Sequence, residues 1–224
     1  GLKHAHPMIE ETVDDLARQG IKNIVALVLA PHFSSYSIGQ YVGRAQTAAE
    51  PHGISVVGIN SWATEPAFID FLATDMAAKK AALPARTRVL FTAHSLPQRI
   101  IDGGDPYPQE LHATATAVAN KLGLVEGDDW AIAWQSAGRT PEPWIGPDIL
   151  DVIDTIAANK QADGVLVSAC GFVADHLEVL YDLDIEAKHR SDHHGLQFDR
   201  TTCVNDDAVV MAALAQRVIT AAQS

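Results

Sequence analysis

The sequence contains little cysteine. Of its 224 residues only two are cysteines, Cys170 and Cys203, and they do not form a Cys-X-X-Cys pair. The chain therefore lacks the thiols for a four-cysteine metal site. We expect a buried thiol at Cys170 and an isolated one at Cys203.

Basic residues are also scarce. The 16 lysines and arginines are outnumbered by 28 aspartates and glutamates, which gives a formal net charge of −12 with histidine neutral. Binding to nucleic acid or to an anionic membrane surface depends on a basic surface. The composition therefore excludes both as expected partners.

Long apolar runs are missing as well. No stretch approaches the roughly 18 residues that a membrane-spanning helix needs. Hydrophobic residues nevertheless make up 47% of the chain, which is enough for a sizeable core. The first residues do not show the pattern of a signal peptide. We therefore predict a cytoplasmic protein without an integral membrane segment.

Short apolar segments alternate with amphipathic ones along the chain. Continuous apolar runs predict strands, and apolar residues at helical spacing predict helices. Strands that alternate with helices imply an α/β fold with a mostly parallel sheet covered on both faces. The same rhythm on each side of about residue 85 fits two similar halves. The predicted strands are 24–30, 54–59, 89–92, 130–134 and 164–169, and the predicted helices are 7–20, 41–50, 64–83, 108–122, 147–158, 173–181 and 205–222.

A histidine, His94, follows a buried strand. The run Val89–Thr92 is apolar and rich in β-forming residues, and it stops at His94 and Pro97. Ligands and chemistry collect at the carboxyl ends of strands in open α/β sheets. A neutral imidazole at this place can accept a proton near pH 7 or bind a metal ion. A strand-end histidine is more often structural, so both interpretations stay open here.

Three carboxylates stand four residues apart after the fifth predicted strand. If this segment is helical, Glu178, Asp182 and Glu186 form a ladder of oxygen ligands along one face. A solvated acidic face is the ordinary interpretation of such a pattern. Like charges at this spacing repel each other, and a bound cation or a protonated carboxylate would relieve the repulsion. The pattern alone leaves an ion-binding or acid–base role and a solvated face as alternatives.

Together these stretches resemble the ferrochelatases, which are class II chelatases. The variants at Asp105–Pro108 and Thr140–Trp144 look most like the Gram-positive branch, whose substrate is coproporphyrin III rather than protoporphyrin IX. The resemblance covers essentially the whole chain. It is carried, in order, by Leu2–His4, Leu29–Ser34, Ala93–Pro97, Gly104–Tyr107, Trp134–Ser136, Pro143–Pro147 and Gly171–Asp182.

The resemblance implies insertion of Fe(II), the substrate metal, into a porphyrin during haem biosynthesis. By the same resemblance His94 is the catalytic base and a metal ligand, and Glu178 is the carboxylate that faces it. Asp182 and Glu186 match outer carboxylates along a metal route, and Tyr41 matches a tyrosine that hydrogen-bonds a porphyrin propionate. The aromatic residues Tyr107 and Trp144 could line the cleft wall or lie in the core, and we favour the core for both.

The resemblance also implies an architecture of two Rossmann-like halves with mostly parallel four-stranded sheets, the first half incomplete. We expect residues 1–85 to be the remainder of the N-terminal half, 86–204 the C-terminal half and 205–224 a closing helix. The strand, substrate-covering loop and arginines with which family members begin are not found in these residues, so we expect the N-terminal part to be missing. We expect no iron–sulfur cluster, because the extra C-terminal cysteines of some relatives are not found, and we expect a monomer.

Other functions remain as alternatives. A cobalt chelatase acting on sirohydrochlorin is the nearest, although such enzymes usually offer more histidines in the cleft. A non-catalytic tetrapyrrole-binding protein would bind porphyrin without metallating it, and changing His94 to Ala would leave its affinity nearly intact. A two-domain sugar- or ion-binding protein of similar layout is disfavoured by the pairing of His94 with Glu178.

Overall fold

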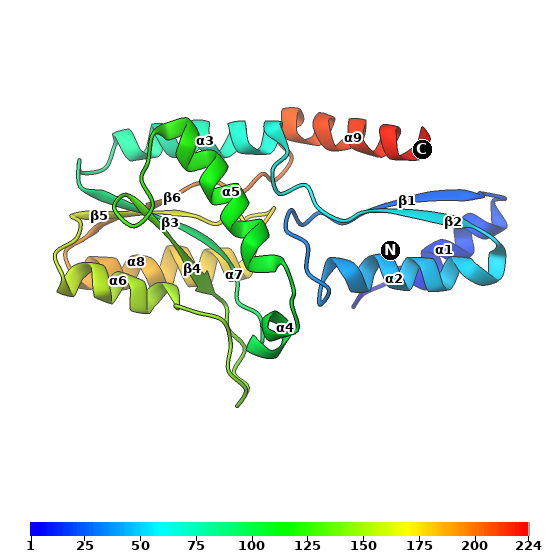
Figure 1. Ribbon diagram of the computed structural model, residues 1–224, viewed down its shortest axis with the longest axis horizontal. Coiled ribbons are helices and arrows are strands. Elements are labelled where there is room, and N and C mark those ends of the chain that lie inside the picture. Colours follow the sequence, from blue (N-terminus) through cyan, green and yellow to red (C-terminus); the bar gives the residue numbers. More distant parts are fainter. Residues whose placement is uncertain (224) are drawn as a thin grey trace. The chain divides into compact units, whose positions relative to one another are not determined.

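Parallel strands followed by helices build the chain, as the alternating apolar pattern predicts. The computed structural model describes residues 1–223, which fall into two compact units (Figure 1). The N-terminal unit contains residues 1–62 and the chain from Met211 onward, and the C-terminal unit is Ala63–Val210. The predicted fold class, an α/β chain with parallel sheets covered by helices, is confirmed.

The N-terminal unit holds two parallel strands paired in register from Asn23 with Ser55 to Leu27 with Ile59. Its small core joins α1, α2 and the residue that precedes β2 through Ile9, Val13, Ala45, Ala49 and Ile54. Its elements are α1 (Ile9–Arg18), β1 (Asn23–Leu27), α2 (Ile38–Ala49), the 3₁₀ turn η1 (Glu50–His52) and β2 (Ser55–Ile59).

The C-terminal unit is larger and holds the second sheet. Its helices are α3 (Pro66–Ala81), α4 (Gln98–Asp102), α5 (Tyr107–Leu122), α6 (Ile149–Ala158), α7 (Leu177–Val179), the π-helix η2 (Leu180–Ala187) and α8 (Lys188–His193). Its strands are β3 (Thr87–His94), β4 (Trp130–Gln135), β5 (Gly164–Ser168) and β6 (Gln197–Arg200). The last helix, α9 (Ala208–Gln223), begins in this unit and continues in the other.

Four parallel strands in the order β4-β3-β5-β6 form this second sheet. Every residue of β5 is buried, as expected for a strand that is covered on both faces. Helices α3 and α5 cover one face, and α6 and α8 cover the other (Figure 1). On the second face, Ile149, Ile153 and Ile156 of α6 pack with Val179 and Leu183 in one hydrophobic core cluster.

The structure divides the chain at a different place from the predicted boundary near residue 85. The compact units separate after Trp62, because α3 packs against α5 and β5 of the C-terminal unit. The predicted closing helix also straddles the two units, since Val210 belongs to the larger one. A helix that precedes a strand in sequence can pack on that strand's own sheet, and no local pattern reveals which neighbour it chooses.

Two local predictions are corrected. The strand β6 was not predicted, because Gln197–Arg200 carries one apolar residue and is held by backbone pairing with β5. The helix expected over 173–181 begins at Leu177 and widens into a π-helix from Leu180. A π-helix is defined by its hydrogen-bond spacing, which side-chain periodicity does not report. Within residues 1–223, no helix is long and apolar enough to cross a membrane.

Candidate active site

The candidate site lies at the carboxyl ends of the central strands of the second sheet. His94, the last residue of β3, pairs in register with Gln135, the last residue of β4. The chain that leaves β5 turns back at once, and the amide of Gly171 donates to the carbonyl oxygen of Thr92 at 3.0 Å. Three strand ends therefore present their following residues at one edge.

A hydrogen bond sets the tautomer of the neutral His94 imidazole. Its Nδ1 lies 2.5 Å from the carbonyl oxygen of Ser95. A carbonyl oxygen can only accept, so Nδ1 carries the proton and donates. In the neutral ring Nε2 then holds the lone pair. The half-buried imidazole can thus accept a proton or bind a cation through Nε2.

Two glycines let aromatic rings approach His94. A Cβ at Gly171 would lie 2.3 Å from the Cβ of Ala93, so only glycine fits there. This close approach places Phe172 beside His94, with ring centroids 6.4 Å apart. A Cβ at Gly138 would lie 2.3 Å from the indole of Trp144. The Trp144 ring in turn lies 6.4 Å from the His94 ring.

A series of side chains links His94 to Glu178. The ring of Phe172 lies 5.2 Å from that of His176, measured between centroids. Nε2 of His176 lies 3.5 Å from a carboxylate oxygen of Glu178, an ion pair when His176 is protonated. Sequence reasoning missed Phe172 and His176, because nothing in their spacing separates them from ordinary turn residues.

The three predicted ladder carboxylates share one cavity of about 340 Å³. His94 is not among the residues that line it, in the part of the chain that the structure describes. The cavity is bounded by the end of β4, the start of α6 and the π-helix. Its lining residues are Gln135, Ser136, Ala137, Arg139, Asp148, Ile149, Leu150, Glu178, Tyr181, Asp182 and Glu186.

The continuous helical segment α7–η2 presents these carboxylates at a regular spacing, with Glu178 in α7 and Asp182 and Glu186 in the π-helix. Val179, Leu183 and Ala187 are fully buried in the core, and each follows one of the three acids directly. Burying the apolar row therefore turns Glu178, Asp182 and Glu186 together toward the cavity. The three carboxylates thus share one face, as predicted. Asp182 and Glu186 lie on a π-helix, a helix type that is rare overall but is often found at functional sites.

Asp182 is held by the end of β4. The hydroxyl of Ser136 donates to its Oδ2, and Nε2 of Gln135 lies 3.5 Å from the same oxygen. The buried hydroxyl of Thr92 donates to Oε1 of Gln135 at 2.8 Å, which turns the amide NH₂ toward Asp182. Ser136 has a positive φ of 60°, a backbone strain that persists only where the surroundings impose it.

The cavity is strongly acidic. Four carboxylates line it, and Arg139 is the cation among its lining residues. Burial raises the pKa of Asp148, and the charges of Asp151 and Asp182 add to the effect. A concave surface with an excess of one charge concentrates ions of the opposite sign. The arrangement favours a hydrated divalent cation.

The described residues do not form a closed metal site. Within residues 1–223, no group of three or more histidine, cysteine, aspartate or glutamate side chains is placed to hold a metal ion. The predicted ligands His94, Glu178, Asp182 and Glu186 are therefore spread over two adjoining regions. Structural metal sites are closed by protein ligands, whereas a substrate ion must be released again.

The other predicted residues fall in different places. Tyr41 lies in the first turn of α2 in the N-terminal unit, where it is half-buried, and Nζ of Lys3 lies 5.8 Å from its ring centroid. Tyr107 is a core residue, as predicted, at 5.6 Å from the Trp134 ring. The core prediction for Trp144 is wrong, because its ring is half-buried beside His94.

Comparison with known proteins identifies the family of the chain. A sequence model of the family described as Ferrochelatase matches residues 1–222. The chain belongs to the ferrochelatase family. It is therefore a metal chelatase, an enzyme of the lyase type, and the predicted family is confirmed.

Individual ferrochelatases are similar over nearly the whole chain. The coproporphyrin III ferrochelatase of Geobacillus kaustophilus is 42% identical, with 98% of this chain and 70% of the relative covered. The ferrochelatase of Herpetosiphon aurantiacus is 44% identical, covering 92% of this chain and 68% of the relative. The coproporphyrin III ferrochelatase of Oceanobacillus iheyensis is 41% identical, covering 100% and 72%.

A solved chelatase shares the fold. The sirohydrochlorin chelatase SirB from Bacillus subtilis subspecies spizizenii, in complex with cobalt, aligns with a TM-score of 0.66 over 99% of this chain and 79% of SirB. The two sequences are only 12% identical, so this likeness shows the shared fold alone.

Proposed function

We propose that this ferrochelatase inserts Fe(II) into coproporphyrin III in haem biosynthesis. The observation that carries the proposal is the acidic cavity, in which α7 and the π-helix that continues it turn Glu178, Asp182 and Glu186 to one side, close to the strand end that bears His94. The names of relatives that are 41–42% identical over nearly the whole chain support coproporphyrin III as the porphyrin.

Iron enters through the carboxylates in this proposal. Asp182 and Glu186 attract the hydrated cation to the cavity, where the excess of carboxylates lowers its electrostatic energy. Glu178 stands at the start of the ladder, linked through His176 and Phe172 to His94. Oxygen ligands suit a hard divalent ion that must be held and then released.

His94 acts as the base and as the last metal ligand. Free porphyrin carries two pyrrole N–H protons, and Fe(II) replaces both, so two protons leave for each iron inserted. Nδ1 of His94 donates to Ser95, which leaves Nε2 to accept a pyrrole proton or to bind the iron. Glu178 and His176 offer further acceptors along which protons can pass to solvent.

The macrocycle lies against the aromatic rings beside His94. Phe172 and Trp144 supply flat apolar surface within 6.4 Å of the imidazole, measured between ring centroids. For the N-terminal unit, the family resemblance supports Tyr41 as a hydrogen-bond partner of a propionate, and the ammonium of Lys3 next to the Tyr41 ring would favour that negative charge.

An anaerobic assay tests the proposal. Coproporphyrin III and Fe(II) are mixed with the chain, and conversion to the metalloporphyrin is followed by visible absorption. We expect conversion well above the protein-free rate, and slower conversion of protoporphyrin IX. A matched mixture of sirohydrochlorin and Co²⁺ is expected to stay at its protein-free rate. Binding of porphyrin without metallation would contradict the proposal and identify a tetrapyrrole-binding protein.

A further inference from the structure

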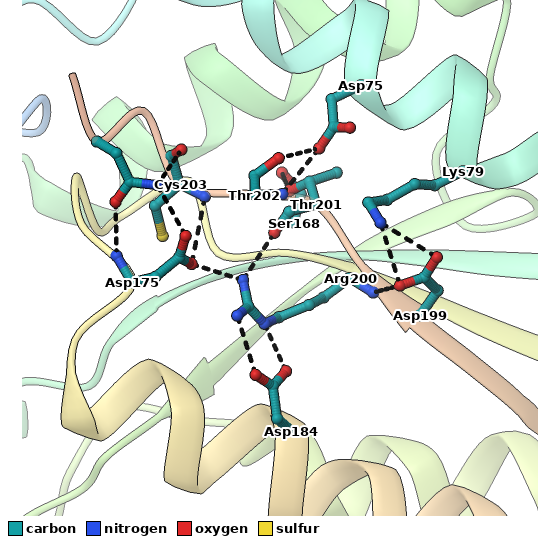
Figure 2. Close-up of polar contacts among 11 residues, drawn as sticks. Asp75, Lys79, Ser168, Asp175, Asp184, Asp199, Arg200, Thr201, Thr202 and Cys203 are labelled. Atoms are coloured by element: carbon teal, nitrogen blue, oxygen red, sulfur yellow. Dashed lines mark hydrogen bonds and ion pairs between the residues drawn. The ribbon is translucent and has the colours of Figure 1, made fainter. Parts of the chain in front are cut away.

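Arg200, at the end of β6, lies behind the π-helix and joins it to the sheet. Its guanidinium makes two parallel contacts with the Asp184 carboxylate, Nε to Oδ1 at 2.5 Å and Nη2 to Oδ2 at 2.9 Å (Figure 2). Its Nη1 also donates to Oδ1 of Asp175 at 2.7 Å. One side chain thus binds both the segment that leads into the helix and the middle of the helix.

Asp184 is on the reverse side of the helix from the cavity. It stands two positions from Asp182 and two from Glu186, and residues at that spacing do not share a helix face. Ser136 and Gln135 hold Asp182 from the cavity side, and Arg200 holds Asp184 from the other. The helix is therefore fixed on two sides.

The strand that carries Arg200 is firmly held in the sheet. Arg200 ends a strand paired with the fully buried β5, and the amide of Thr201 donates to the carbonyl of Val167 at 2.8 Å. The next residue, Thr202, is held by Asp75 through both its amide and its hydroxyl (Figure 2). Only 12% of the Arg200 side chain is exposed, so its bidentate pair is screened less than a surface pair.

We propose that Arg200 is a positioning residue for metal insertion: through Asp175 and Asp184 it holds α7 and the π-helix, so that Glu178, Asp182 and Glu186 stay turned into the cavity. The inference rests on the function proposed above for these carboxylates. It adds a residue that touches neither the cavity nor the rings beside His94.

Electrostatics explains why the helix needs this contact. Residues 177–187 contain four acids and no basic residue, so the segment repels itself. Arg200 supplies a positive charge on the side away from the cavity, where it offsets the repulsion without occupying the cation site. Hydrogen bonds to Asp184 and Asp175 raise the pKa of Arg200 still further, so the charge is permanent.

The test uses Asp184→Asn, since this change leaves Arg200 paired with Asp175 and does not strand a buried charge. Asp184→Glu restores the charge, and Arg200→Lys keeps a cation but loses the bidentate pair. Lys79→Met is the matched control, because Lys79 pairs with Asp199 on the same strand and does not contact the helix. Amide hydrogen exchange over residues 177–187 and the KM for Fe(II) and for porphyrin are measured on each variant.

We expect exchange in this segment to become about tenfold faster in Asp184→Asn and Arg200→Lys. The KM for Fe(II) should rise about fivefold in both, with the porphyrin KM unchanged. Asp184→Glu should recover much of the loss, and Lys79→Met should match the wild type.

Unchanged exchange in Asp184→Asn, an unchanged KM for Fe(II), or an equal rise in Lys79→Met would each overturn the positioning role. These outcomes differ from failure of the proposed function, which would appear as a wild-type chain that does not metallate porphyrin. An active wild type with an unaltered Asp184→Asn variant overturns the role of Arg200 alone.

Discussion

Two neighbouring regions at the edge of one sheet differ sharply in chemistry. Around His94 the neighbours are the rings of Phe172 and Trp144, and the imidazole is half-buried. In the adjoining region, four carboxylates line a cavity, and Arg139 is the cation among its lining residues. One region suits a flat apolar macrocycle and a base, and the other suits a hydrated cation.

The difference shows how one enzyme can handle two unlike substrates. Fe(II) loses hydration energy unless oxygen ligands replace its water, whereas a porphyrin gains by leaving water for apolar surface. If the oxygen ligands for Fe(II) and the apolar surface for the porphyrin lay in one pocket, the carboxylates would repel the propionates of the macrocycle. Phe172 and His176 link the two regions without merging them. The following predictions separate the two regions experimentally.

The largest effect is expected at the base. His94→Ala should lower the rate of iron insertion by about a hundredfold or more, because no other group would accept the pyrrole protons at that place. Porphyrin affinity, measured by fluorescence quenching, should change little. His112→Ala is the control, since His112 is half-exposed on α5 and pairs with Glu126. If His94→Ala retained half of the wild-type activity, His94 would not be the base.

A smaller and different effect is expected in the cavity. Asp182→Asn should raise the KM for Fe(II) about tenfold and leave the porphyrin KM unchanged, because one of the facing charges is lost while the shape is kept. Asp192→Asn serves as the control, an exposed acid of α8 that pairs with Lys188. An equal change in both KM values would show that the two regions act as one.

The hydrogen bonds of the buried Gln135 with Thr92 and Asp182 should contribute to the stability of the fold. Gln135→Leu removes the nearer acceptor of the Thr92 hydroxyl, which is left with the Ser168 carbonyl oxygen at 3.5 Å, and it removes a donor to Asp182, so the free energy of unfolding should fall by about 1–3 kcal/mol. Urea denaturation measures the change. The exposed Gln161→Leu is the control and should alter the free energy by less than about 0.5 kcal/mol. Equal values for the two variants would mean that this hydrogen-bond series is not needed.

The smallest effect is expected from thiol reagents. Burial raises the pKa of Cys170 to about 12, and burial together with the charge of Asp175 raises that of Cys203 to about 12. Thiolate is the reactive form, so neither cysteine should react with a disulfide reagent in the native protein at pH 8. Both should react after unfolding, and iron insertion should be unaffected by the reagent. Rapid labelling of the native protein would show that these buried thiols become exposed to solvent.

Two different signals in the sequence pointed to the site. The position of His94 followed from an apolar run that ends at a proline, a local signal that the structure reproduces. The ladder of Glu178, Asp182 and Glu186 followed from spacing, and the shared cavity agrees with it. The roles of these residues remain predictions, because they rest on resemblance and await the measurements above.

Other site residues carried no local signal. Gln135 and Ser136 lie within the segment Trp134–Ser136, which carries part of the family resemblance. Their hydrogen bonds to Asp182 nevertheless depend on a helix about 46 residues further along the chain. Phe172 reaches His94 only because Gly171 lets two strands' ends approach. Such contacts depend on packing between distant segments, which composition and periodicity do not encode.

The sequence by itself determined the alternation of strands and helices, the acidic charge and the family, since each rests on local pattern or on several motifs in order. Only the tertiary structure decided that α3 joins the larger unit, that Gln197–Arg200 forms an edge strand, and that the acidic helix is a π-helix pinned by Arg200. The physical reason is that these features are held by hydrogen bonds and ion pairs between residues far apart in the chain, whose geometry exists only once the core has packed.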